Sequence, residues 1–331
     1  MGQKLIKKIL IAIIEISFII SISCISNATN TESKKQLYIN PDDYVKEETL
    51  LVPESLKAEE KIMEYDIYTG ETKEVDMNQV KQNLAIFNQK QGNVEINELQ
   101  AYNPYGVINP TSLINNMRTT ITRVANPTQF PYVATCRLKY DVYGLEGVSS
   151  GALVGSNILL TTAHCVMNRE DGDAFFADWN AYPGYNNGVY NGLGCGWTKV
   201  YYSNLWKQTH AIEYDWCLCV LGQPLGSSVG YWGVRSYNNS ASLTGSIVTG
   251  YGYPTDIGEG KYQCNVMGVV GNVQNGYFIA DNAVALGGMS GGPMNYGVDG
   301  NIVGIIKAGN GVSTQCVRIT GDIFDLIQDN R

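Results

Sequence analysis

The chain has 331 residues, of which 44% are hydrophobic and 16% charged, and its formal net charge is −8. This composition is too apolar for a disordered protein, and the length allows a large hydrophobic core. The acidic balance also argues against a dedicated nucleic-acid binder, so we expect no nucleic-acid partner. Residues 29–106 hold 15 acidic and 8 basic residues but only 3 glycines, whereas residues 107–331 hold 32 glycines. The sequence therefore divides into three parts, 1–28, 29–106 and 107–331.

Residues 1–28 have the features of a secretory signal peptide. Three lysines precede an apolar run over residues 9–25, and Ser26-Asn27-Ala28 offers small residues where a signal peptidase cuts. The alternative is a membrane anchor, but a run of about 17 residues that contains Glu15 is marginal for the hydrocarbon core. A lipidated Cys24 is a second alternative. We expect a secreted protein with no stable membrane association.

Residues 29–106 are interpreted as an acidic leader that folds separately or is partly disordered. Acidic residues and lysines are dense over residues 42–76, a helix is predicted near residues 78–88, and the segment contains no His and no Cys. The functional interpretation is a propeptide that keeps an enzyme inactive until secretion. The alternative is a solvated linker or a cell-surface spacer.

Residues 107–331, the body, have the pattern of an all-β domain. Short β-rich runs alternate with Gly, Asn and Pro, which is typical of a β-barrel or a sandwich. One helix is predicted at residues 321–328, where Ile323, Phe324 and Ile327 share a face. The predicted strands, in chain order, cover residues 130–138, 151–160, 217–221, 246–251, 262–270, 277–281 and 302–306.

Seven cysteines remain once a signal peptide is removed. In an oxidising compartment some of them should form disulfides, and the odd number leaves at least one free or bonded to another molecule. We expect no metal site and no cofactor, because there is no Cys-x-x-Cys pair and the chain has only two histidines. The seven are Cys136, Cys165, Cys195, Cys217, Cys219, Cys264 and Cys316.

Three residues are predicted to act together in catalysis. His164 ends an apolar strand, Asp215 begins another 51 residues later, and Ser290 lies in the segment Gly-Gly-Met-Ser-Gly-Gly-Pro at 287–293. Each alone has an ordinary structural explanation. Together they supply a nucleophile, a base that works near pH 7 and a carboxylate that orients the base. The backbone N–H groups of Gly288 and Ser290 are predicted to form the oxyanion hole.

The sequence around these positions resembles the chymotrypsin-like serine proteases, and within them the bacterial glutamyl endopeptidases most closely. The resemblance rests on Thr-Ala-His-Cys around His164, on Asp215 opening a strand and on the glycine-rich segment around Ser290. It extends over about residues 120–329. It implies two six-stranded antiparallel barrels with the triad between them, a closing helix and a secreted zymogen. Protein or peptide substrates and a monomeric enzyme are expected.

The primary specificity pocket departs from the glutamyl endopeptidase pattern. Acid-specific members place a His on the pocket strand, but residues 302–309 contain none, and Ala285 stands where the family has Thr or Ser. A simple alignment gives a pocket wall of Ile306 and Ala285, which favours apolar or small P1 residues over Glu and Asp. A shift of one residue instead puts Lys307 in the pocket, where it would pair with a substrate carboxylate. We favour the apolar pocket.

Two other functions are alternatives to a secreted serine endopeptidase that acts through an acyl-enzyme. One is a catalytically silent secreted binding protein on the same fold, although such proteins usually lack a triad member. The other is a thiol enzyme, for which only Cys165 has a neighbouring histidine. The second histidine, His210, is interpreted as an exposed loop residue near Lys207.

Overall fold

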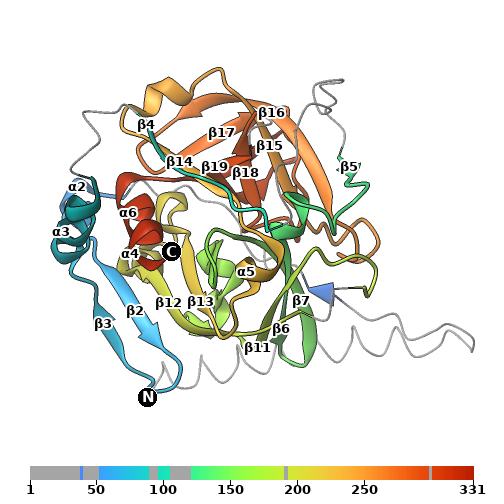
Figure 1. Cartoon of the computed structure of the whole chain (residues 1–331), viewed down its shortest axis with the longest axis horizontal. Coiled ribbons are helices and arrows are strands. Elements are labelled where there is room, and N and C mark those ends of the chain that lie inside the picture. Colours follow the sequence, from blue (N-terminus) through green and yellow to red (C-terminus); the bar gives the residue numbers. More distant parts are fainter. Residues whose placement is uncertain (1–37, 40–51, 89–95, 105–120, 190–192, 298–299) are drawn as a thin grey trace, which may run out of the picture. The chain divides into compact units, whose positions relative to one another are not determined.

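The structure is a computed structural model that describes residues 38–39, 52–88, 96–104, 121–189, 193–297 and 300–331 (Figure 1). These residues belong to one compact unit. The predicted signal peptide, Cys24 and the expected leader boundary near residue 107 lie outside the described residues. Within the described ranges, no helix is long and apolar enough to span a membrane.

The first sheet contains six strands of the body. Its order is β11-β6-β7-β8-β13-β12, followed by β2 and β3 of the leader, with β1 parallel to β7. A single bridge between Ala181 and Cys195 joins β11 to the segment before β12. The strands are β1 (Tyr38–Ile39), β2 (Ile62–Asp66), β3 (Thr72–Glu74), β6 (Thr135–Val142), β7 (Leu145–Leu153), β8 (Ile158–Thr161), β11 (Ala177–Pro183), β12 (Trp197–Ser203) and β13 (Cys217–Leu221).

The second sheet closes into a barrel. Its order is β18-β15-β16-β17-β20-β19, and an additional pairing of β18 with β19 closes these six strands. On the outside, β14 runs parallel to β19, β4 pairs with β14, and β5 pairs with β16. The strands are β4 (Ile96–Leu99), β5 (Thr122–Arg123), β14 (Gly233–Tyr237), β15 (Ile247–Gly252), β16 (Cys264–Val273), β17 (Tyr277–Asp281), β18 (Pro293–Tyr296), β19 (Asn301–Gly309) and β20 (Ser313–Arg318).

The predicted all-β class with two barrels is confirmed, and the remaining elements are short. Figure 1 shows the strands of the second barrel, in orange and red, grouped apart from the green and yellow strands of the first. The short elements are the hairpin of β9 (Met167–Asn168) with β10 (Ala174–Phe175), and the helices α2 (Glu54–Lys57), α3 (Met77–Asn88), α4 (Asn204–Thr209), α5 (Leu225–Val229) and α6 (Gly321–Asn330).

Alternation along the strands builds the hydrophobic cores on either side of the second sheet. Along β19, Ile305 packs in the larger core that contains the first barrel, whereas Ile306 packs in the core of the second barrel. Because both faces of β19 are covered, apolar residues and glycine follow one another without alternation over residues 302–306. It lies where the two barrels meet and carries residues of the candidate site.

Each predicted element has a counterpart in the structure, and two of the predicted strand runs differ most from what is observed. The strands at 217–221 and 277–281 and the helices near 78–88 and 321–328 are present. The run at 130–138 becomes a strand only from Thr135, because Pro131 has no N–H to donate and residues 132–134 form a 3-10 turn. The run at 151–160 is two strands, β7 and β8, that pair across a turn.

The leader is not a separately folding segment in its described parts. Strand β2 pairs with β12 along its whole length, from Ile62 opposite Ser203 to Asp66 opposite Lys199. Strand β4 pairs in the same way with β14. Figure 1 shows β2 and β3, in blue, beside the yellow β12. The leader therefore extends one sheet of each barrel, and the expectation of a separately folding segment is wrong for these described parts.

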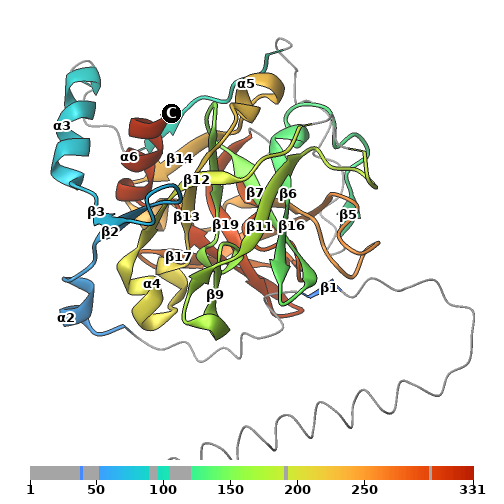
Figure 2. The same ribbon diagram turned by 90° about the horizontal axis from the view of Figure 1, so that it is seen from below.

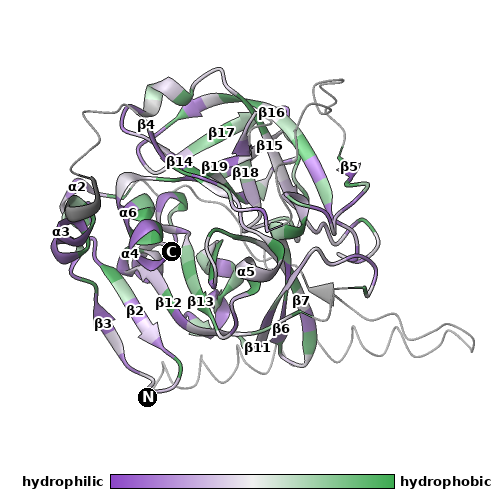
Figure 3. Ribbon diagram, in the orientation of Figure 1, coloured by the Kyte–Doolittle hydropathy of each residue, from purple (hydrophilic) through white to green (hydrophobic). Residues whose placement is uncertain are grey.

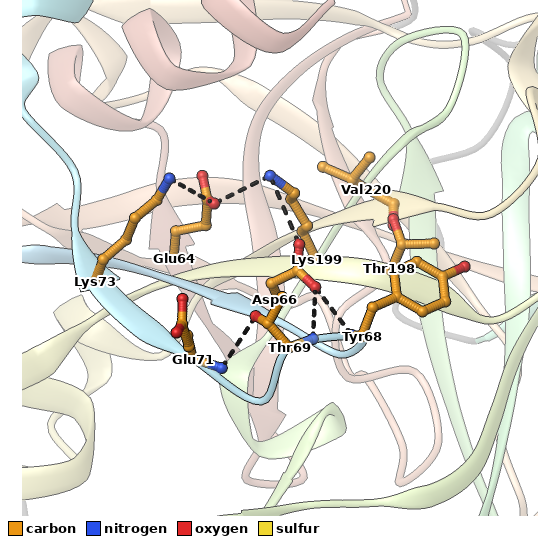
Figure 4. A network of polar contacts seen from close by, with 9 residues as sticks. All are labelled: Glu64, Asp66, Tyr68, Thr69, Glu71, Lys73, Thr198, Lys199 and Val220. Atoms are coloured by element: carbon orange, nitrogen blue, oxygen red, sulfur yellow. Dashed lines mark hydrogen bonds and ion pairs between the residues drawn. The ribbon is translucent and has the colours of Figure 1, made fainter.

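The acidic residues of the leader meet basic residues of the body (Figure 4). A carboxylate oxygen of Glu64 lies 3.1 Å from the ammonium of Lys199 and 3.1 Å from that of Lys73. Burial raises the pKa of Glu64, but hydrogen bonds from Lys199, Tyr201 and Lys73 outweigh it and leave the pKa below its ordinary value. Glu98 of β4 likewise pairs with Arg235 of β14.

Helix α3 of the leader packs on α6 at the end of the body. It begins after Asp76, whose carboxylate accepts the N–H groups of Asn78 and Gln79 as an N-cap. Among its described side chains, Val80 and Leu84 are buried, and Figure 2 shows the helix beside α6. In Figure 3 α3 is mostly hydrophilic, whereas α6 carries hydrophobic residues. The leader thus contacts the closing helix, and Lys81 of α3 forms an ion pair with Asp322 of α6 at 2.7 Å.

This contact predicts that a leader substitution destabilises the body. In an inactive Ser290→Ala precursor, Leu84→Ala should lower the free energy of unfolding by about 2–3 kcal/mol, because it empties a buried site. Denaturant titration followed by tryptophan fluorescence measures it, since all five tryptophans lie in the body. Gln82→Ala, at an exposed position of the same helix, is the control. An unchanged midpoint for Leu84→Ala would show that the leader folds independently.

Candidate active site

His164 and Asp215 meet because their strands pair. His164 follows the end of β8 and Asp215 precedes the start of β13, and these strands are antiparallel neighbours with Thr161 opposite Cys217. The residues beyond these two strand ends therefore emerge at the same edge of the sheet. Nδ1 of His164 lies 2.6 Å from Oδ2 of Asp215, and the His164 backbone N–H donates to Oδ1 at 3.0 Å.

The Asp215 carboxyl is fully buried, and its surroundings keep it ionised. Burial raises its pKa, but the charge and hydrogen bonds of His164 and the ammonium of Lys307 together bring the pKa below its ordinary value. An ionised carboxylate only accepts hydrogen bonds, so Nδ1 of His164 must carry the hydrogen of their contact. Asp215 thus fixes both the orientation and the tautomer of the imidazole.

Ser290 lies on a tight turn just before β18. Its hydroxyl donates to the backbone carbonyl of Lys307 at 2.7 Å, and its own carbonyl accepts the Ser150 N–H at 2.8 Å. Gly291 has φ +79°, and a Cβ at this position would clash with the Thr161 hydroxyl and the Ser150 carbonyl. Only glycine fits there. The segment around Ser290 is therefore held between β19 of the second barrel and β7 and β8 of the first.

Each of the two expected oxyanion donors is the N–H of a peptide whose carbonyl accepts a hydrogen bond from a neighbouring residue. The Met289 carbonyl accepts the Gly292 N–H at 3.0 Å. The Gly287 carbonyl accepts two hydrogen bonds from the loop after β15. A trans peptide points its N–H opposite to its C=O, so the N–H groups of Gly288 and Ser290 point away from these partners.

The three candidate pocket residues do not share one environment. Ala285 and Ile306 are buried in the core of the second barrel. Lys307 is also buried, with an exposed fraction of 3%, and it lies at a register shift of β19 between Ile306 and Ala308. Its positive charge is one of the causes that lower the pKa of Asp215.

Comparison with known proteins agrees with this geometry. The sequence profile of the trypsin family matches residues 121–321. The chain belongs to the trypsin family. It is a chymotrypsin-like serine endopeptidase, a hydrolase whose substrates are proteins or peptides.

Individual relatives place it near the glutamyl endopeptidases. The chain is 32% identical to the glutamyl endopeptidase of Bacillus licheniformis over 135 residues, 41% of this chain and 40% of that one. A solved Glu endopeptidase in complex with MPD has 27% identity and a TM-score of 0.55, covering 63% of this chain and 94% of that chain. The extracellular metalloprotease of Bacillus subtilis is 29% identical over 227 residues, 67% of this chain and 70% of that protein. The predicted resemblance to glutamyl endopeptidases is confirmed.

The second histidine of this trypsin-family chain is not the exposed loop residue that the sequence suggested. Nε2 of His210 lies 3.0 Å from both carboxylate oxygens of Asp173, and its side chain is only 26% exposed. Its ring meets Trp206 edge-on at 5.0 Å between centroids. Sequence reasoning missed this pair because Asp173 and His210 lie 37 residues apart and follow no recognisable motif.

The seven cysteines of the body are free thiols in the structure, so the expected disulfides are not present among them. Burial raises the pKa of the Cys136, Cys217 and Cys316 thiols well above their ordinary range. A thiol with a raised pKa is a poor nucleophile, which disfavours the thiol-enzyme alternative for these three. Across the described ranges, no group of three or more His, Cys, Asp or Glu side chains is arranged to hold a metal ion.

A cavity of about 950 Å³ lies between the leader and the body. Leader residues of α2 and β3 line one side, and Glu213, Tyr214 and Trp216 line the other. None of the candidate catalytic or pocket residues lines it. The cavity is therefore separate from the candidate catalytic and pocket residues.

Proposed function

We propose that this endopeptidase cleaves peptide bonds with Ser290 as nucleophile, His164 as general base and Asp215 as the carboxylate that orients the base. The observation that carries the proposal is the 2.6 Å contact between His164 Nδ1 and Asp215. In this contact the N–H at Nδ1 donates its hydrogen bond to the carboxylate. The other ring nitrogen, Nε2, is therefore the basic nitrogen of the neutral imidazole.

In the proposed reaction the Ser290 oxygen attacks the carbonyl carbon of the substrate while its proton moves to Nε2 of His164. The N–H groups of Gly288 and Ser290 stabilise the tetrahedral oxyanion, each by about 3 kcal/mol. The imidazolium then gives its proton to the leaving amine, and an acyl-enzyme ester remains. A water molecule hydrolyses that ester, with His164 again acting first as base and then as acid.

The hydroxyl hydrogen of Ser290 has to change partner before attack. It is donated to the Lys307 carbonyl in the structure, and a hydroxyl has only one hydrogen. Catalysis therefore requires it to turn toward His164. In a catalytically silent binding protein on this fold, the Ser290 hydroxyl would keep its hydrogen bond to the Lys307 carbonyl. Reactivity at Ser290 therefore distinguishes the two functions.

The triad proposal predicts that a fluorophosphonate labels Ser290 and that the two histidines differ. His164→Ala should lower kcat by several orders of magnitude, because no base would remain for the serine. His210→Ala should keep kcat within about a factor of two but lower the melting temperature, since buried Asp173 loses its imidazole partner. Mass spectrometry and steady-state kinetics measure these effects. Absence of label, or equal losses at both histidines, would contradict the assignment.

We further propose that the primary pocket accepts apolar or small P1 residues. Ile306 and Ala285 offer no charged or polar side chain to a substrate carboxylate, and burying an unpaired carboxylate opposes binding. The influence of Lys307 on the pKa of Asp215 supports a role for its ammonium beside the triad rather than in the pocket. The enzyme would then differ in specificity from the glutamyl endopeptidases that it resembles.

Peptide-library cleavage tests this specificity. The wild type should cut best after apolar or small residues, and Lys307→Ala should lower the overall rate without changing the order of P1 preference. Lys261→Ala, which removes a half-exposed lysine paired with Glu259, is the control for loss of charge. A strong preference for glutamate or aspartate would contradict the apolar pocket. Loss of that preference in Lys307→Ala would then identify Lys307 as its cause.

We also propose that the protein is secreted as a zymogen, with residues 1–28 as signal peptide and 29–106 as propeptide. The strand pairing and charge complementarity between leader and body support a propeptide that folds with its enzyme rather than a spacer. The relative from Bacillus subtilis is named as extracellular.

Amino-terminal sequencing of the active form from the culture medium tests the processing. The mature chain should begin near Val107 or Ile108, with a cut near Arg118 or Arg123 as the next expectation. A secreted active chain that still begins near Thr29 would show that the leader is not a propeptide. A chain that keeps Met1 would contradict the signal peptide.

A further inference from the structure

No side chain of its own peptide fixes the orientation of the Gly288 N–H, one of the two proposed oxyanion donors. The N–H of Gly288 belongs to the peptide between Gly287 and Gly288, and neither residue has a Cβ. Gly288 has φ +88°, a conformation that side chains disfavour and glycine accepts. A peptide between two glycines rotates with little steric resistance, so its orientation depends on the hydrogen bonds made by its carbonyl.

Within the described part of the chain, the hydrogen bonds to the Gly287 carbonyl come from one residue, Thr255. Its backbone N–H donates to the Gly287 carbonyl at 2.8 Å, and its hydroxyl donates to the same oxygen at 3.1 Å. A carbonyl oxygen has two lone pairs, and Thr255 supplies a donor for each of them. The approach is close, because a Cβ added at Gly288 would lie 3.0 Å from the Thr255 nitrogen.

Thr255 is itself held in place by a turn at Pro254 and by a hydrogen bond of Tyr253. It follows Pro254, whose carbonyl accepts the N–H groups of Ile257 and Gly260. Two residues earlier, the Tyr253 N–H donates to the Ser150 hydroxyl at 2.9 Å, and that hydroxyl donates to the Gly288 carbonyl at 2.7 Å. The carbonyls on both sides of the Gly288 N–H are therefore fixed by one connected network.

We propose that the Thr255 hydroxyl is a positioning residue of the oxyanion hole, which holds the Gly287–Gly288 peptide with its N–H toward the developing oxyanion. The inference rests on the proposed function, because it concerns how the Gly288 donor is oriented. With the opposite orientation the peptide would present a carbonyl oxygen to the oxyanion, which repels it. Thr255 thus acts through Gly288 and does not itself contact the substrate.

The test replaces Thr255 by valine, which keeps the shape of the side chain but has no hydroxyl. Thr255→Val should lower kcat about three- to tenfold, the factor contributed by one neutral hydrogen bond, and leave KM within about twofold. Thr255→Ser, which keeps the hydroxyl, should restore kcat. The matched control is Thr198→Val in β12, which removes a hydroxyl hydrogen bond to the Val220 carbonyl of β13, and it should leave kcat unchanged.

Inhibitor binding separates positioning from general damage. A peptide aldehyde adds to Ser290 and forms an oxyanion, so Thr255→Val should weaken its affinity by the same factor as kcat. The corresponding peptide alcohol forms no oxyanion and should bind both proteins equally. Unchanged kcat in Thr255→Val, or equal losses for aldehyde and alcohol with a lower melting temperature, would overturn the inference. Retained turnover in His164→Ala would instead refute the proposed function.

Discussion

The site depends on keeping one fully buried carboxylate ionised. A buried charge without partners is so costly that the group would take up a proton. Asp215 avoids this through two hydrogen bonds from His164, one from its backbone and one from its ring, and through the nearby ammonium of Lys307. The backbone contact fixes the main chain of His164 and the ring contact fixes its tautomer. The pairing of β8 with β13 is what brings the two residues together.

The position of Ser290, the proposed nucleophile, depends on contacts from both barrels. Ser150 of the first barrel donates its N–H to the Ser290 carbonyl, and Ile306 of the second exchanges backbone hydrogen bonds with Gly291 and Gly292. Glycine is required at these positions because the neighbouring strands approach too closely for a side chain. Ser290 is thus positioned by backbone contacts with both barrels. A shift of one barrel against the other would move the serine relative to His164.

Local sequence patterns predicted individual strands, helices and turns. They could not predict contacts between residues that lie far apart in the sequence. The apolar run at 217–221 and the amphipathic helix at 321–328 contain their own signals, and so does the glycine-rich turn around Ser290. The pairing of Asp173 with His210 and the contact of Thr255 with Gly287 join segments 37 and 32 residues apart. No periodicity encodes such contacts. The strands of the leader were missed for the same reason, because β3 is exposed and polar and becomes a strand only through its neighbour.

The mode of leader docking determines what activation of the proposed zymogen would require. The leader contributes β2 to the edge of β12 and β4 to the edge of β14, and Glu64 neutralises Lys199 across the first of these junctions. Cutting the chain after residue 106 breaks none of these backbone pairs and none of these ion pairs. The leader therefore has to be pulled from two sheets, or digested where it lies, before the edges of β12 and β14 are exposed. Hydrolysis of one peptide bond and release of the leader are thus separate physical steps.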